Sequence, residues 1–384
     1  MELLVQLAII IVATKFAGSI AAKLGQPSVL GEIIVGIIIG PAILGIIHTN
    51  ELLKTFSELG VIFLMFFAGV ETNIKDLTKN IKPALSVAFM GVVFPFIGGY
   101  IVGSQFGMST THAIFLGIVL TATSVSISVQ TFRELNFMNT RESATVLGAA
   151  IADDIIGLII LAIMLSITLG GDISITAILV KQIIFFAIIL LANWLVIPKL
   201  IKWMTKPKLN DLLIVLAIVT CLVYSYFAEY MGISNIIGAF FAGLAFTNPK
   251  TSIILEEKVL PTISVLFIPV FFVSIGLEVS FVGFFDHIWL IIILSVVAVI
   301  TKIIGAAIGA RFTGFVGIST LIIGIAMVSR GEVALITSKI GLQNGLFTEE
   351  YFTPIIIAIV VTTLVTPPLL KIFISRSKNA ANSL

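Results

Sequence analysis

Two adjacent carboxylates stand inside an otherwise apolar run. Asp153 and Asp154 lie within GAAIADDIIGLIILAIM, and Lys302 interrupts a second run, WLIIILSVVAVITKIIGAAIGA. An ionisable side chain at membrane depth costs at least ~2.5 kcal/mol even on insertion scales, so these residues are candidates for a function. Neighbouring helical residues point about 100° apart, so one aspartate can pair with Lys302 while the other faces a water-filled cavity.

Burial favours the neutral form of both a carboxylate and an amine, so a proton can be exchanged for a metal cation at such a place. A site of one carboxylate, hydroxyls and carbonyls suits an alkali cation better than a soft metal. We therefore expect one of the two aspartates, Asp153 or Asp154, to bind Na⁺ or a proton, with the other close by. A salt bridge with Lys302 that merely locks two helices is the alternative for Asp153.

The hydroxyls for such a site stand in TATSVSIS. The segment Thr121, Ala122, Thr123 and Ser124 has β-branched and hydroxyl residues that compete for backbone hydrogen bonds. A shift of 207 residues places it over Val328, Ser329, Arg330 and Gly331, where a charge and a glycine interrupt another apolar run. We read both as breaks in discontinuous helices, which expose backbone carbonyls and half-helix ends to a cation. Glu332 follows the second break and can pair with Arg330, in a structural or a direct role.

The same shift matches glycines along the two halves of the chain. Seven of thirteen glycines in residues 25–117 fall on another glycine, where the frequency of 31 in 384 predicts about one by chance. The matched pairs are Gly25 and Gly232, Gly31 and Gly238, Gly36 and Gly243, Gly69 and Gly276, Gly98 and Gly305, Gly107 and Gly314, and Gly117 and Gly324. An inverted repeat explains this pattern, although membrane helices also use glycine at packing contacts.

The elements that position these residues are membrane helices. Of 384 residues, 59% are hydrophobic and 11% charged, and the mean hydropathy is +1.20. Apolar runs of about 20 residues match the hydrocarbon thickness of a bilayer, and a barrel would instead alternate polar and apolar residues. We predict an all-α polytopic membrane protein with 13 transmembrane helices, two of them discontinuous and crossing. The expected spans are 2–22, 28–47, 57–71, 83–103, 111–133, 142–169, 177–204, 209–229, 233–247, 258–277, 287–311, 314–340 and 352–375.

This division predicts one transporter domain over 1–384. Repeat one covers about 1–170, a linker helix 177–204, and repeat two about 209–376. Loops after odd-numbered spans hold sixteen of the 22 Lys and Arg residues, whereas loops after even-numbered spans hold only Lys54, Lys181 and Lys339. The positive-inside rule then places the N-terminus outside and the C-terminus in the cytoplasm of a cell that carries the protein in its plasma or inner membrane. The first span lacks a basic start and a cleavage site, so we expect it to be retained.

Several classes of protein are disfavoured. One cysteine, Cys221, and three histidines without HExxH argue against a disulfide framework and a metalloenzyme. An intramembrane aspartyl protease needs two aspartates on different helices, so we expect no enzyme and no cofactor. A cation channel stays open as an alternative because broken helices also build selectivity filters, but a pore does not need a buried Asp–Lys pair.

The motifs ADD, TATS, FLMFFAGVET, GQPSVLGEIIVGIIIGP and SRGE resemble the NapA-type sodium/proton antiporters, bacterial monovalent cation/proton antiporters of the second branch with an NhaA-like fold. The resemblance covers nearly the whole chain. It implies that Asp154 binds Na⁺ or a proton, that Asp153 pairs reversibly with Lys302, and that electrogenic exchange proceeds by elevator-like alternating access.

The resemblance also implies a core bundle that includes 83–169 and 287–376, and a homodimer formed through a panel of about 1–47 and 209–247. Na⁺, or Li⁺, and H⁺ would be the substrates, with the lipid bilayer as surroundings and no nucleic acid partner. Potassium efflux antiporters share the fold but typically carry Gln where this chain has Asp153. A K⁺/H⁺ antiporter of the same fold is therefore the alternative hypothesis for the function.

Overall fold

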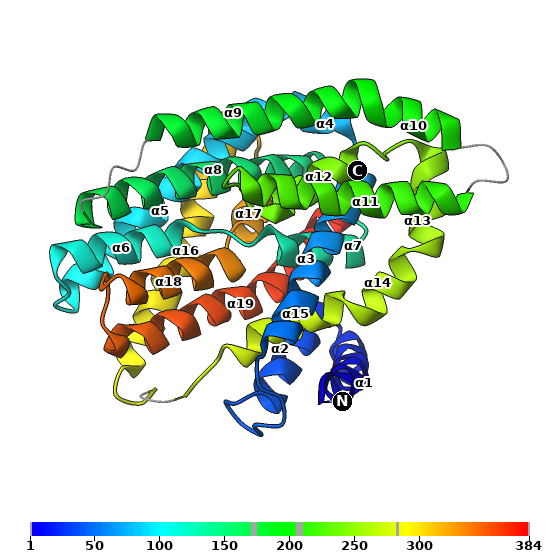
Figure 1. Ribbon diagram of the computed structural model, residues 1–384. Coiled ribbons are helices and arrows are strands. Elements are labelled where there is room, and N and C mark those ends of the chain that lie inside the picture. The colour runs from blue at the N-terminus through cyan, green and yellow to red at the C-terminus, as the bar shows by residue number, and fades with distance from the viewer. Residues whose placement is uncertain (1, 170–174, 205–209, 282–283, 383–384) are drawn as a thin grey trace. The chain divides into compact units, whose positions relative to one another are not determined.

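The computed structural model describes residues 2–169, 175–204, 210–281 and 284–382, and within these ranges it contains helices and no strand (Figure 1). The helices of the first range are α1 (Glu2–Lys23), α2 (Ser28–Ile39), α3 (Glu51–Glu71), α4 (Ile74–Lys79), α5 (Ile81–Gln105), α6 (Thr110–Thr121), α7 (Val125–Glu134) and α8 (Arg141–Leu169). Next come α9 (Ile175–Leu191), the π-helix η1 (Ala192–Val196), α10 (Ile197–Met204), α11 (Asn210–Tyr230), α12 (Asn235–Leu244), α13 (Pro249–Lys258), α14 (Leu260–Leu266) and α15 (Ile268–Leu277). The last range holds α16 (Ile288–Phe312), α17 (Ile318–Ala326), α18 (Glu332–Gln343) and α19 (Glu349–Asn382).

Ten helical stretches in the described ranges are long and apolar enough to cross a membrane. Each of the thirteen predicted apolar ranges contains helix, but the boundaries differ in places. The range 28–47 is helical only to Ile39. The helix stops there because Gly40 is extended and the ring of Pro41 disfavours a helical conformation for the residue before it. Conversely, α19 continues beyond 375 to Asn382.

Contacts divide the described chain into two units, which are treated separately. Unit 1 contains the described residues of Met1–Ile11, Glu51–Asp76 and Ile173–Phe271. Unit 2 contains the described residues of Val12–Asn50, Leu77–Asp172 and Phe272–Leu384. All of the predicted site residues belong to unit 2, so the site can be described within that unit alone.

Within unit 2, helices from distant parts of the sequence lie side by side. Helix α16 packs along α5, α6 packs against α5, and α17 packs against α16. Helix α18 contacts both α6 and α19, and Figure 1 shows it in orange between the cyan α6 and the red α19. Helix α19 also contacts α7, α16 and α17, so one continuous helix borders both pairs of shorter helices, α6 with α7 and α17 with α18.

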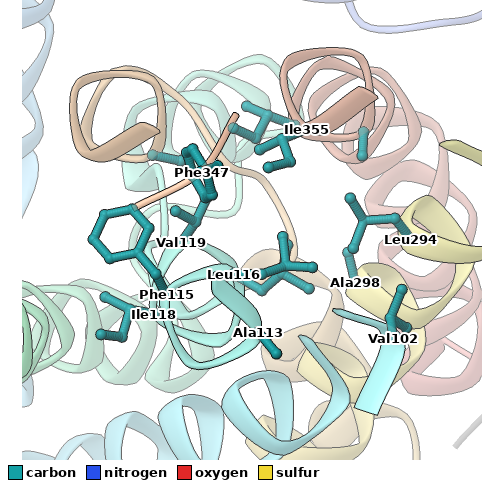
Figure 2. Packing of buried hydrophobic residues seen from close by; sticks show 14 of the residues in the cluster. Val102, Ala113, Phe115, Leu116, Ile118, Val119, Leu294, Ala298, Phe347 and Ile355 are labelled. Atoms are coloured by element: carbon teal, nitrogen blue, oxygen red, sulfur yellow. The ribbon is translucent and has the colours of Figure 1, made fainter. Parts of the chain in front are cut away.

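An apolar cluster fills the space around α6. Figure 2 shows Phe115 and Leu116 of α6 among side chains of α5, α16 and α19. The Phe115 ring meets that of Phe347 edge to face, with ring centroids 5.0 Å apart. A Cβ on Gly341 would lie 2.3 Å from the Phe115 ring, so a glycine is required for α18 to approach this closely. This packing fixes the position of α6 from the middle of the helix to the residues just before its C-terminal end.

Matched glycines make matched contacts in the two halves of the chain. A Cβ on Gly31 would lie 2.5 Å from the carbonyl oxygen of Ala17, and one on Gly238 would lie 2.2 Å from that of Tyr224. Ala17 and Tyr224 are themselves separated by 207 residues. The helix pairs α1 with α2 and α11 with α12 therefore touch at equivalent places.

The other matched glycines behave in the same way. Equivalent neighbours, again 207 residues apart, face Gly36 and Gly243 (Val273 and Phe66), Gly69 and Gly276 (Phe240 and Ile33), Gly98 and Gly305 (Thr301 and Phe94), and Gly117 and Gly324 (Phe96 and Ile303). The remaining two pairs have positive φ on both sides, 69° and 75° at Gly25 and Gly232, and 76° and 92° at Gly107 and Gly314. Glycine adopts such angles without the steric cost that a Cβ brings.

Candidate ion-binding site

Two helices are interrupted where the sequence predicts a break. Helix α6 ends at Thr121 and α7 begins at Val125, and the residues between them include Ala122 and Ser124 in extended conformations. Helix α17 ends at Ala326 and α18 begins at Glu332, with Met327 to Gly331 between them. Residues 122–124 and 327–331 are called the first and the second break. Each break leaves carbonyls at one helix end and N–H groups at the next without helical partners.

The two breaks are hydrogen-bonded to each other. The backbone N–H of Ser124 donates to the carbonyl oxygen of Ser329 at 2.7 Å, and the Ser329 hydroxyl donates to the carbonyl oxygen of Ser124, also at 2.7 Å. Ser128 of α7 donates to the carbonyl oxygen of Ala326 at 2.6 Å. A Cβ on Gly331 would lie 2.6 Å from Ser124 Oγ, so the breaks are in direct contact here.

Asp153 of α8 and Lys302 of α16 meet beside the first break. Lys302 Nζ lies 3.1 Å from Asp153 Oδ2 and also donates to the carbonyl oxygen of Thr121 at 2.7 Å. The same carboxylate oxygen accepts a hydrogen bond from Thr123 Oγ1. The Lys302 and Asp153 side chains are 0% and 1% exposed, which makes this a fully buried ion pair. The Thr121 hydroxyl turns back to the carbonyl oxygen of Ile118 and takes no part in it.

Asp154 has a different environment from its neighbour. It is partly exposed, and among the residues that the structure describes it forms no hydrogen bond or ion pair. Asp153 Oδ1 and Ser124 Oγ are among the oxygens of unit 2 that are buried without a hydrogen-bond partner. Buried oxygens without partners are costly, and a cation or a proton would satisfy them.

Arg330 of the second break is fully buried and binds backbone carbonyls. Its Nε and one terminal nitrogen donate to the Leu120 carbonyl oxygen at 3.1 and 2.6 Å. Further bonds reach the carbonyl oxygens of Val328 at 2.9 Å and Ala298 at 3.2 Å. Together with Lys302 on Thr121, Arg330 thus places a second cation at the C-terminal end of α6, where the helix dipole is negative. Glu332 is the first residue of α18.

Sequence reasoning missed the residues that hold this arginine. The carbonyl groups of Leu120 and Ala298 are backbone groups of residues with apolar side chains, and such side chains give no signal of a polar role. Thr363 of α19 donates its hydroxyl to the Arg330 carbonyl oxygen, and only the two adjacent threonines in VVTTLVTPP hint at a polar contact there.

The arrangement offers hard oxygen ligands next to an available carboxylate. Within the described ranges, no three His, Cys, Asp or Glu side chains gather into a metal cluster. A cation at this place would instead be held by a carboxylate with hydroxyl and carbonyl oxygens, a set that suits alkali cations.

Comparison with known proteins identifies the family. The model of the family described as sodium/hydrogen exchanger, transmembrane, matches residues 8–375. The chain belongs to the sodium/hydrogen exchanger family. It is accordingly a multi-pass membrane protein of a cation/proton antiporter family, and the site just described lies in the region that the family model covers.

Individual relatives match the chain over almost its whole length. The Na(+)/H(+)-K(+) antiporter GerN of Bacillus cereus is 48% identical over 370 residues, which cover 96% of each chain. The Na(+)/H(+) antiporter of Enterococcus hirae is 42% identical over 97% of this chain and 98% of its own. Among solved structures, the sodium proton antiporter MjNhaP1 of Methanocaldococcus jannaschii has a similar fold, with a TM-score of 0.63, 18% identity and 97% of both chains covered.

Proposed function

We propose that this exchanger moves cytoplasmic Na⁺, and Li⁺, out of the cell in exchange for external H⁺, and that Asp154 carries the exchanged ion. The observation that supports this is the contrast between two adjacent carboxylates. Asp153 is buried in an ion pair, whereas Asp154 is partly exposed and has no hydrogen bond or ion pair within the described chain. Family membership and two antiporters that are 48% and 42% identical support the same reading.

In this proposal Asp154 holds either Na⁺ or a proton, never both. Thr123 and Ser124 complete the cation site with oxygens of the first break, and Ser124 Oγ, which has no hydrogen-bond partner within the described chain, is a candidate ligand. Competition at one carboxylate couples the two fluxes. It also predicts that exchange falls in acid, where Asp154 stays protonated.

Asp153 and Lys302 supply the second part of the mechanism. When their pair opens, Lys302 can give up its proton and Asp153 gains a free oxygen beside the site. If Lys302 loses one proton as Na⁺ binds and Asp154 loses another, two protons move for one Na⁺ and the exchange is electrogenic.

We further propose the finer architecture of NapA-type antiporters, with thirteen membrane helices in two inverted repeats and a core that moves as an elevator. The matched contacts of the glycine pairs support the repeat, since the same helix pairs touch at the same shift of 207 residues. A homodimer, an external N-terminus and a cytoplasmic C-terminus in the cell membrane complete the proposal.

Potassium is the second candidate substrate. The relative that is 48% identical is named as a Na(+)/H(+)-K(+) antiporter, which is the observation in its favour. The carboxylate and hydroxyl oxygens at the site would accept K⁺ as well as Na⁺.

Proteoliposomes of the purified protein test the proposal. With an acid interior and a pH dye inside, external NaCl should make the interior alkaline, and Asp154→Asn should abolish this response because an amide cannot exchange a proton for a cation. KCl, added separately, separates the two substrates: an equal or larger response would move the assignment to potassium.

Asp211→Asn is the control variant, because this carboxylate lies in the first turn of α11, in unit 1. Its exchange should equal that of the unaltered protein. Substantial exchange by a folded Asp154→Asn variant would show that Asp154 is not the ion-binding residue. If the unaltered protein responded to neither salt, the alternative of a cation channel would be favoured instead. An imposed membrane potential that leaves the initial rate unchanged would contradict electrogenic exchange.

A further inference from the structure

Among the described residues, the second break has one hydrogen-bonded anchor outside the helices that form the two breaks and the ion pair. Thr363 lies in the middle of α19, is fully buried, and donates its hydroxyl to the carbonyl oxygen of Arg330. Every other hydrogen bond described for the second break reaches α6, α7, α16, the flanking helices α17 and α18, the first break or the second break itself. Thr363 therefore ties the second break to a continuous helix that forms neither break.

The position of this peptide group matters because its neighbours hold the site together. Ser329, directly before Arg330, makes both hydrogen bonds to Ser124. Gly331, directly after it, faces Ser124 Oγ with no room for a Cβ. The guanidinium of Arg330 holds the carbonyl at the end of α6. A rotation of the Arg330 peptide group would displace all three contacts at once.

Two neighbouring threonines on the same helix show what is special about Thr363. Thr362 and Thr366 are equally buried, but their hydroxyls donate within α19, to the carbonyl oxygens of Ile359 at 2.6 Å and of Thr362 at 2.8 Å. The Thr363 hydroxyl has a single hydrogen, and two carbonyl oxygens lie within its reach, that of Ile359 in the same helix at 3.1 Å and, closer, that of Arg330. Bonds within the helix are the usual state of a threonine in a membrane helix, so the contact with Arg330 is the feature to explain.

We propose that Thr363 is a positioning residue of the exchanger: by holding the Arg330 carbonyl, its hydroxyl sets the geometry of the two breaks and thereby the affinity for the transported cation. This rests on the proposed cation site at Asp154 and the first break. Without the hydroxyl, the Arg330 carbonyl loses its partner in a buried place and the peptide group turns to find another. The Ser124 oxygens then move away from the cation.

The test measures the half-saturating Na⁺ concentration and the maximal exchange rate separately in proteoliposomes. Thr363→Val keeps the volume and removes the hydroxyl. A net hydrogen bond contributes roughly one power of ten at most to an equilibrium, so we expect the half-saturating Na⁺ concentration to rise about fivefold. The maximal rate should change less than about twofold, since the proton carrier and the Asp153–Lys302 pair are untouched.

Thr362→Val and Thr366→Val are matched controls, because each removes a buried hydroxyl from the same helix without touching the second break. Both should stay within about twofold of the unaltered protein. Thr363→Ser should have the Na⁺ affinity of the unaltered protein, because serine keeps the hydroxyl donor. If Thr363→Val does not fold, Thr363→Cys replaces it, and its weaker donor should give a smaller rise.

Three results would overturn the proposal. The first is an unchanged half-saturating Na⁺ concentration in Thr363→Val, or in Thr363→Cys if that variant is used. The second is an equal rise in the control variants, which would make the effect a general loss of hydroxyls. The third is a Thr363→Ser variant as weak as Thr363→Val. In each case Na⁺-driven exchange by the unaltered protein and its loss in Asp154→Asn would leave the proposed function standing.

Discussion

The two helix breaks occupy equivalent places 207 residues apart and differ in their chemistry. The first break contributes hydroxyls and no charge, through Thr123 and Ser124. The second contributes a buried cation and a glycine, Arg330 and Gly331. The two breaks exchange hydrogen bonds through Ser124 and Ser329, and Arg330 of the second break caps the end of α6.

The glycine contacts make this difference informative. All seven matched glycine pairs keep their contacts or backbone angles in both halves, so the packing repeats while the charged residues of the candidate site do not. Lys302, for example, stands where the first half has Pro95, and Asp153 where the second half has Val360. The close backbone contacts occur in both halves because both halves pack their helices in the same way. A single ion site, in contrast, needs only one set of ligands and one set of counter-charges.

The largest effect is expected from removing the charge of the second break. Arg330→Met would leave the carbonyls of Leu120, Val328 and Ala298 without their donor in a buried place, at about 1–3 kcal/mol for each. We expect a marked fall in thermal stability in detergent and no exchange in proteoliposomes. Arg311→Met, at the exposed end of α16, is the control and should keep both. A stable, active Arg330→Met variant would contradict the assignment of Arg330 as the cap of α6.

A smaller effect is expected from closing the gap between the breaks. Gly331→Ala places a Cβ 2.6 Å from Ser124 Oγ and 2.8 Å from its Cβ, so one break must move. We expect the maximal rate or the Na⁺ affinity to fall by roughly tenfold, which corresponds to a cost of about 1.4 kcal/mol.

A double-mutant cycle identifies the cause of that fall. In a Ser124→Gly background, Gly331→Ala should cause little further loss, because the clashing side chain is gone. Gly157→Ala, at a helical glycine with open space around it, should be neutral. A loss in the double variant equal to the sum of the single losses would mean that the breaks do not compete for this space.

The smallest effect on stability is expected in the first break. Ser124→Ala removes a buried hydroxyl that has no hydrogen-bond partner within the described chain, so the thermal stability should stay within the error of the measurement. The half-saturating Na⁺ concentration should rise severalfold, because a cation ligand is lost. Ser128→Ala should give the opposite pattern, with reduced thermal stability and little change in Na⁺ affinity. The reason is that the Ser128 hydroxyl donates a hydrogen bond to the Ala326 carbonyl oxygen. If Ser124→Ala left the Na⁺ response unchanged, Ser124 Oγ would not be a ligand.

Much of the site was predictable because its residues violate the apolar pattern around them. Asp153, Asp154, Lys302 and Arg330 stand out in any membrane span, and the repeat aligns the two breaks before any coordinates are considered. The residues alone did not decide which aspartate pairs with Lys302, since either could face it. The contact of Asp153 with Lys302 and Thr123 settles that question in this structure.

Other features were not predicted from the sequence. The end of α2 at Ile39 contradicts the predicted span to 47, because hydropathy continues where Gly40 and Pro41 stop the helix. Leu120 and Ala298 take part through their backbone carbonyls, which every residue has, so their side chains say nothing of it.

The sequence by itself determined the membrane class, the approximate places of most helices, the glycines that make matched contacts and the ionisable residues within apolar runs. These follow from hydropathy, from the cost of burying charge and from the need for glycine where two backbones touch, and all three are properties of residue type and spacing. Only the tertiary structure decided which carbonyls Arg330 and Lys302 bind, that Thr363 holds the second break, and that Asp153 rather than Asp154 is paired. Apart from the bond of Arg330 to Val328, these hydrogen bonds join residues 30 to 210 positions apart, so they exist only once the helices have packed.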